Sequence, residues 1–192
     1  MGLTRDNLTT AFKPMREVDE RVFDAVASWH SPLLDRTMPE LSVVATKSRL
    51  WMGIAALLAV FGGAKGRRTA IEGMVAIGVN SFVVNVPLKS AVRRKRPTDD
   101  VPEERRLEKP KSYSFPSGHT ASAAAFSGIV GRAYPKLSPP INALAAMVGF
   151  SRVYTGVHFP GDVLGGWIVG KGVAFLVYWI AEKCGLAPTQ VD

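Results

Sequence analysis

Three short segments of this chain contain residue types that handle phosphate. The segments are Lys89 with Arg96-Pro97, then Pro116-Ser117-Gly118-His119, then Ser151-Arg152 with His158 and Asp162. Imidazoles exchange protons near neutral pH and can act as nucleophiles. Cations and backbone N–H groups stabilise negative charge on oxygen. Two histidines, three basic side chains and a carboxylate can together move a phosphoryl group.

The first segment places its cations at helical spacing. Lys89 and Arg96 are seven residues apart, so a helix puts them on one face, with Arg93 at i+4 on the same stripe. Pro97 disfavours helical geometry at Arg96, which predicts that the helix ends there. The alternative is a basic helix end that anchors the chain at lipid headgroups, a description that fits the run 93–95.

The second segment predicts the start of a helix. Backbone N–H groups at a helix N-terminus are unpaired, and glycine allows an anion to approach them closely. Around Gly118 this predicts a phosphate cradle, with the Ser117 hydroxyl as a further ligand and His119 as a proton donor. The alternative is that Ser117 only caps the helix and His119 is incidental.

The third segment pairs an imidazole with a carboxylate. Asp162 follows His158 by four residues, across the Pro160-Gly161 bend. A carboxylate that accepts a hydrogen bond from one ring nitrogen fixes the tautomer and leaves the other nitrogen free to attack. The carboxylate should also raise the pKa of the His158 imidazole. Alternatively Asp162 caps the last helix, and its two oxygens can serve both purposes.

The elements that must position these residues are apolar helices. The chain has 192 residues, of which 47% are hydrophobic, and the apolar residues are grouped in stretches. A bilayer core requires about 20 helical residues. An all-α, polytopic membrane bundle is therefore predicted, with about five transmembrane helices near 50–64, 69–91, 118–134, 138–155 and 162–182. The alternative is a soluble bundle with very apolar helices, but residues 73–88 lack the polar face that it requires.

The N-terminal part differs in character. Residues 1–49 are predicted to form an amphipathic segment, with an apolar stripe at Met15, Val18, Val22, Val26 and Trp29. Such a helix can lie on the membrane surface or pack on the bundle. Pro39 is expected to start the segment that leads into the first span. Residues 50–185 then form the membrane-embedded domain, with the motifs in 89–162, and 186–192 form a tail.

The three segments, in this order and spacing, resemble the signature of the type 2 phosphatidic acid phosphatase superfamily, which also includes vanadium haloperoxidases. Every position of that signature is filled between Lys89 and Asp162. The resemblance implies that His158 is the nucleophile that forms a phosphohistidine, oriented by Asp162, and that His119 is the general acid. It further implies that the phosphate oxygens are held by Lys89, Arg96, Ser117, Gly118 and Arg152.

The expected activity is metal-independent hydrolysis of a lipid phosphate or polyprenyl (di)phosphate ester, without a cofactor. Fixed cations can stabilise the charge that spreads over the phosphoryl oxygens. One enzymatic alternative is a vanadate-dependent haloperoxidase, which the short and apolar chain disfavours. A non-enzymatic alternative is a protein that binds anionic lipids through the basic loop 89–111. Because one histidine must be neutral and the other charged, a bell-shaped pH profile is expected.

The expected partners are a phosphorylated lipid and the bilayer of the cell membrane, with no nucleic acid. Five spans place the three motifs on one side of the membrane. That side carries 17 of the 24 lysines and arginines and the far side carries 6. The positive-inside rule therefore favours a cytoplasm-facing site, whereas the resemblance implies an outward-facing one, as in most bacterial relatives.

Overall fold

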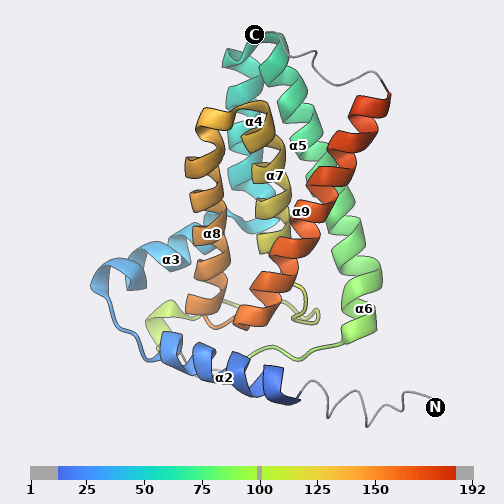
Figure 1. Cartoon of the computed structure of the whole chain (residues 1–192). Coiled ribbons are helices and arrows are strands. Elements are labelled where there is room, and N and C mark those ends of the chain that lie inside the picture. Colours follow the sequence, from blue (N-terminus) through green and yellow to red (C-terminus); the bar gives the residue numbers. More distant parts are fainter. Residues whose placement is uncertain (1–12, 99–100, 185–192) are drawn as a thin grey trace, which may run out of the picture.

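The chain folds into a bundle of helices with the motif-bearing loops at one end (Figure 1). The computed structural model describes residues 13–98 and 101–184, and no strand occurs within these ranges. The predicted all-α class is confirmed. The predicted tail 186–192 and residues 1–12 lie outside the described residues. The bundle consists of α4 (Arg49–Phe61), α5 (Gly63–Val83), α7 (Gly118–Ala133), α8 (Ser138–Tyr154) and α9 (Pro160–Lys183).

Within the described residues, two helices are long and apolar enough to cross a membrane. One is Gly63–Val92, in which α5 continues through the π-helical turn η2 (Val84–Leu88) into α6 (Lys89–Val92), and the other is α9. A bent pair, Pro32–Val44 with Thr46–Phe61, qualifies if it counts as one span with a 62° bend. The helices α7 and α8 have 16 and 17 residues. A helix therefore forms in each predicted stretch, while the count of five crossings remains a prediction.

Small residues place α7 at the centre of the bundle, where it contacts α5, α8 and α9. Ala121 and the run 123–125 are completely buried. Gly170 on α9 has no room for a side chain, because an added Cβ would overlap the Ala121 carbonyl oxygen. Such close backbone approach is typical of helix packing in membranes. As a result, the N-terminus of α7 and the first turn of α9 lie next to each other.

The N-terminal helix α2 (Lys13–Ala27) lies across the motif end of the bundle, below α8 and α9 in the view of Figure 1. The predicted amphipathic helix is present, and part of its apolar stripe is exposed rather than packed on the bundle. Val18 and Val22 are 58% and 44% exposed, whereas Phe23 and Asp19 are buried. Asp19 faces inward because it pairs with Arg94 and accepts the backbone N–H of Gly161 at the motif end.

The next helix, α3 (Pro32–Val44), begins earlier than predicted. Pro32 occupies its first turn, where the missing N–H of proline costs nothing. Pro39, the predicted start, lies inside the helix instead. The sequence offers two prolines seven residues apart, and the first one starts the helix.

The buried side chain of Arg105 connects the N-terminal helices to the bundle. Arg105, in the short helix η3 (Glu103–Arg105), is completely buried. Its guanidinium donates to the carbonyl oxygens of Ala27 at 2.7 Å and Trp29 at 3.1 Å, and it pairs with Asp35 at 3.3 Å. It also lies 4.4 Å from the ring centroid of Tyr154 on α8. This side chain thus connects α2, α3 and α8 to the loop that follows α6.

Candidate active site

The His158 and Asp162 side chains face each other across the loop between α8 and α9. Nδ1 of His158 lies 3.3 Å from Oδ2 of Asp162, and both side chains are almost inaccessible to solvent. The same oxygen accepts from the Ser114 hydroxyl at 2.6 Å and from the backbone N–H of Phe159 at 2.9 Å. One carboxylate oxygen therefore both orients the imidazole and caps α9, so the two interpretations of Asp162 hold together.

The second nitrogen of His158 contacts a cation. Nη1 of Arg96 lies 3.1 Å from Nε2 of His158 and also donates to the Val157 carbonyl at 2.8 Å. A guanidinium has donors only, so Nε2 must supply a lone pair. The ring proton then resides on Nδ1, where it is donated to Asp162. This tautomer leaves Nε2 available for nucleophilic attack once Arg96 moves away.

Burial keeps the imidazole neutral. The pKa of His158 is lowered by burial to about 4, although its hydrogen bond with Asp162 acts in the opposite direction. The positive charges of Arg152 and Arg96 lower this pKa further. The expected upward influence of Asp162 is present, but the predicted net rise is wrong because desolvation of a completely enclosed ring outweighs it.

Ser112, in the loop before α7, contacts the two cations of the first segment. Nζ of Lys89, a buried residue, donates to the Ser112 hydroxyl at 3.2 Å. Nε of Arg96 donates to the Ser112 carbonyl at 3.0 Å, and its Nη2 donates to the Ser112 hydroxyl at 3.3 Å. One residue thus brings both cations to the same place.

The predicted ladder of cations on one helical face is wrong. The helix α6 ends at Val92, and Arg93 has a left-handed backbone with a φ of 50°. Arg93 is exposed and donates to the Ser90 carbonyl, away from the site. Arg96 therefore reaches the site from an extended segment rather than from the helix that carries Lys89.

The start of α7 has the predicted form. Ser117 is the N-cap, and its buried hydroxyl accepts from the N–H and the hydroxyl of Thr120 at 3.4 and 3.0 Å. Gly118 is the first helical residue, and a Cβ on it would meet only Val84, at 3.8 Å. Nε2 of His119 is buried without a hydrogen-bond partner. The protein thus leaves open space above Gly118 and an unsatisfied nitrogen beside it.

Arg152 lies in the wall behind His158. It is buried in the last turn of α8, and its carbonyl oxygen accepts the backbone N–H of His158 at 3.1 Å. Its Nη1 donates to the hydroxyl of Ser42 on α3, while its Nε has no partner. The residue fixes the loop that carries His158 and adds positive charge to the enclosure.

These residues surround a cavity of about 260 Å³. Five of the predicted site residues line it, whereas Ser117, Arg152 and Asp162 lie in the wall behind. Arg96 and Lys89 supply positive charge, and His158 and His119 supply imidazoles from separate elements. The lining residues from the three segments and their connecting loop are Lys89, Arg96, Pro110, Ser112, Gly118, His119 and His158.

The sequence matches the family model described as the PAP2 superfamily over residues 70–186. The chain belongs to the PAP2 superfamily. Among PAP2 relatives, phosphatidylglycerophosphatase B of Bacillus subtilis is 30% identical over 182 residues, which cover 88% of this chain and 86% of that protein. Undecaprenyl-diphosphatase of Sulfolobus acidocaldarius is 35% identical over 133 residues, which cover 66% of this chain and 61% of that protein.

A solved PAP2 structure has the same fold. The crystal structure of the transmembrane PAP2 type phosphatidylglycerolphosphate phosphatase from Bacillus subtilis superposes with a TM-score of 0.70 at 28% sequence identity. The match covers 92% of this chain and 91% of that one. The predicted family, the polytopic membrane bundle and the phosphatase class are therefore confirmed.

Arg94 and Asp19, which sequence reasoning missed, extend this PAP2 site. Arg94 bridges two carboxylates, with Nη1 at 3.2 Å from Asp162 and Nη2 at 2.6 Å from Asp19 on α2. Asp19 also accepts the backbone N–H of Gly161 at 2.6 Å. The sequence interpretation placed Arg94 among the basic anchors, and no spacing rule relates it to a carboxylate in α2.

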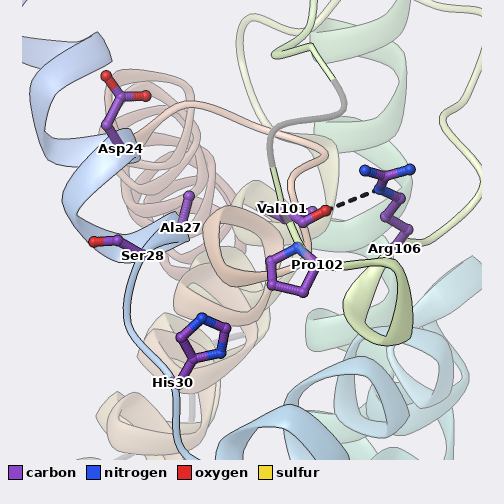
Figure 2. Close-up of a pocket in the computed structure, with 7 residues that line it drawn as sticks. All are labelled: Asp24, Ala27, Ser28, His30, Val101, Pro102 and Arg106. Carbon is purple, nitrogen blue, oxygen red and sulfur yellow. Dashed lines mark hydrogen bonds between the residues drawn. The ribbon is translucent and has the colours of Figure 1, made fainter.

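A second and larger cavity, of about 490 Å³, lies apart from the PAP2 residues. Figure 2 shows it between the end of α2 and the segment after residue 100, with His30 at its edge. Nε of Arg106 donates to the Val101 carbonyl at 2.9 Å on its far side. His30 is exposed there. No predicted site residue lines this cavity, so the smaller cavity is the candidate active site.

Proposed function

We propose that this PAP2 protein is a membrane phosphatase that hydrolyses a lipid phosphate or polyprenyl (di)phosphate ester through a phosphohistidine. The observation that carries the proposal is the His158 imidazole, held by Asp162 on one side and hydrogen-bonded through Nε2 to Arg96 on the other. A neutral, oriented nitrogen beside a phosphate-binding cation is the arrangement that nucleophilic attack on phosphorus requires.

In the first step, Nε2 of His158 attacks the phosphorus and the bond to the lipid oxygen breaks. His119 gives its proton to the departing alkoxide, while Asp162 stabilises the positive charge that develops on the His158 ring. Lys89 and Arg96 stabilise the equatorial oxygens together with the backbone N–H at Gly118. In the second step, water attacks the phosphorus while His119 accepts its proton, and the bond between phosphorus and Nε2 breaks, which releases phosphate and restores His158.

Two of the proposed phosphate ligands act from behind the cavity wall. Ser117 reaches a phosphate only by giving up its bond with Thr120, so its main contribution is to cap α7. Arg152 supports the loop of His158 through its backbone carbonyl, and its unpartnered Nε leaves one donor for the substrate. We therefore place Lys89, Arg96 and Gly118 in the closest contact with phosphate.

The substrate follows from the position of the cavity. Its cationic lining lies at the end of α6, the last part of a membrane-spanning helix, where a phosphate on a lipid headgroup resides. The PAP2 relatives include an undecaprenyl-diphosphatase and a phosphatidylglycerophosphatase, whose substrates are lipids. We propose the cell membrane as the location and, from the distribution of lysine and arginine, a site that faces the cytoplasm.

The decisive experiment combines turnover with trapping. Purified protein should release phosphate from phosphatidate, phosphatidylglycerophosphate or a polyprenyl diphosphate, in the presence of EDTA, and vanadate should inhibit it. His158→Ala should reduce turnover by at least about a thousandfold, as loss of a nucleophile does in other covalent enzymes. Wild-type protein denatured at alkaline pH during turnover should carry an acid-labile, base-stable phosphoryl group, which His158→Ala should lack.

The non-enzymatic alternative has a different outcome. If His158→Ala retains the cellular function and binds anionic vesicles as the wild type does, the protein acts as a lipid binder. Vanadate-dependent oxidation of bromide by the wild type would instead indicate a haloperoxidase.

A further inference from the structure

The helix that carries Lys89 contains one wide turn. The segment η2 between α5 and α6 is π-helical, and the backbone N–H of Lys89 donates to the carbonyl oxygen of Val84, five residues back. In an α-helix the donor to Val84 would be the N–H of Leu88, four residues on. The wide turn therefore contains one extra residue, and Lys89 stands where Leu88 would stand in a regular helix.

Pro87 accounts for the wide turn. Proline has no N–H, so the carbonyl oxygen of Val83 lacks the donor that an α-helix supplies four residues on. A bilayer offers no water to such an oxygen, and a local π-helical adjustment is one way in which membrane helices satisfy it. The span Gly63–Val92 contains no other proline. The extra residue thus follows from a single proline, two positions before Lys89.

The pattern of burial along this helix shows the displacement. Asn80 and Val84 are buried and are four residues apart, as expected for one face of an α-helix. The next buried residue is Lys89, at a spacing of five. At the regular spacing of four, Leu88 would face the bundle and Lys89 would take the present, exposed position of Ser90. The wide turn therefore decides whether a cation or a leucine faces the cavity.

We propose that Pro87 is a positioning residue of the active site, which sets the register of the helix so that Lys89 faces the phosphate. The inference rests on the phosphatase function proposed above, in which Lys89 binds the transferred phosphoryl group. Nζ of Lys89 donates to the Ser112 hydroxyl at 3.2 Å, and both residues line the cavity. Pro87 is exposed and lies outside the cavity lining, so its effect on the chemistry is indirect.

The first test is Pro87→Ala, which gives the Val83 carbonyl its missing donor and allows a regular helix. Lys89 then leaves the cavity. For phosphatidate or farnesyl diphosphate, whichever the wild type hydrolyses, kcat/KM should fall at least about tenfold, as expected for the loss of one charge-assisted contact. The thermal midpoint should stay unchanged or rise, because the helix gains a hydrogen bond. Pro39→Ala, which removes the proline inside α3, is the matched control and should stay within about twofold of the wild type.

A double variant tests whether Pro87 acts through Lys89. Lys89→Met removes the cation, so a later change of register has nothing left to displace. Pro87→Ala combined with Lys89→Met should therefore be as active as Lys89→Met alone. A further loss in the double variant would contradict the inference, because it would show that Pro87 acts through other residues.

Deletion of one residue should restore the register. Val86 is an exposed residue of the wide turn. When it is removed from the Pro87→Ala variant, the regular helix is one residue shorter, and Lys89 returns to its present position. This variant should recover most of the lost kcat/KM. The inference is wrong if Pro87→Ala keeps wild-type activity, or if the deletion recovers none of it in a folded protein. A wild type that releases phosphate from neither lipid nor from phosphatidylglycerophosphate would instead contradict the phosphatase proposal itself.

Discussion

At the residue scale, the protonation state of His158 decides whether the site can attack phosphorus. Burial lowers the pKa of this imidazole to about 4, so the ring stays neutral through mildly acidic conditions. Below that pKa the proton occupies Nε2 and the lone pair is lost. Wild-type kcat/KM should therefore fall on the acid side of the predicted bell with a midpoint below pH 6.5, the usual value for histidine.

Asp162→Asn tests the same assignment. It removes the partner that raises the pKa of His158, so the acid limb should move to lower pH while kcat falls at least about a hundredfold through loss of the correct tautomer. The measurement is kcat/KM of the wild type and the variant from pH 4 to 9. A wild-type acid limb at or above pH 6.5 would contradict a buried, neutral His158.

Gly118 offers a second prediction at this scale. An added Cβ meets only Val84 at 3.8 Å, so Gly118→Ala should fold normally and gain about 0.4–1 kcal/mol from reduced freedom of the unfolded chain. The methyl group projects toward the space where a phosphate oxygen approaches the helix N-terminus. We expect kcat/KM to fall at least about tenfold with an unchanged or higher thermal midpoint. Equal activity would show that phosphate binds elsewhere in the cavity.

The predicted site residues lie together at the smaller cavity, as their order and spacing in the sequence indicated. The residues that the sequence could not indicate are those recruited across the fold. Asp19 meets Gly161 over 142 positions, and Ser114 meets Asp162 over 48. No local pattern specifies such contacts, since they depend on how α2 and the serine loop pack on the bundle.

At the element scale, the helices were predictable and some of their ends were not. Long apolar stretches form helices regardless of neighbours, which explains the agreement for α5 and α9. The end of α6 was misjudged because Pro97 gave a clear stop signal, whereas the left-handed turn at Arg93 has none. The burial of Asp19 on α2 was not predictable, because an ion pair rather than hydrophobicity buries this residue.

That ion pair makes α2 a support of the active site. Asp19→Asn removes a carboxylate 2.6 Å from Arg94, which then shifts onto Asp162 and weakens its hydrogen bond with His158. We expect kcat to fall about tenfold and KM to change less than about twofold, because the substrate contacts are intact. Asp24→Asn, at an exposed position of the same helix, should match the wild type. An equal effect of the two variants would exclude the link.

At the scale of the whole molecule, the two ends of the bundle lie on opposite sides of the membrane if the proposed topology is correct. The only cysteine, Cys184, is exposed just after α9, at the end away from the motifs. With a cytoplasm-facing site, an impermeant thiol reagent should label Cys184 in intact cells. Thr98→Cys in a Cys184→Ser background should be labelled only after the cells are opened. The reverse pattern would place the active site outside.

The contact between Arg96 and Nε2 of His158 means that one of the proposed phosphate ligands covers the proposed nucleophile. The cation that neutralises an incoming phosphate is also the one that blocks the attacking nitrogen, so capture of the substrate and exposure of the nitrogen are a single exchange of hydrogen bonds. A terminal phosphate, with two negative charges, draws Arg96 away more strongly than a phosphodiester, with one. A terminal phosphate therefore exposes Nε2 more readily than a phosphodiester does. Nearly every other phosphate in a membrane is a diester, so this exchange favours lipids that end in a phosphate.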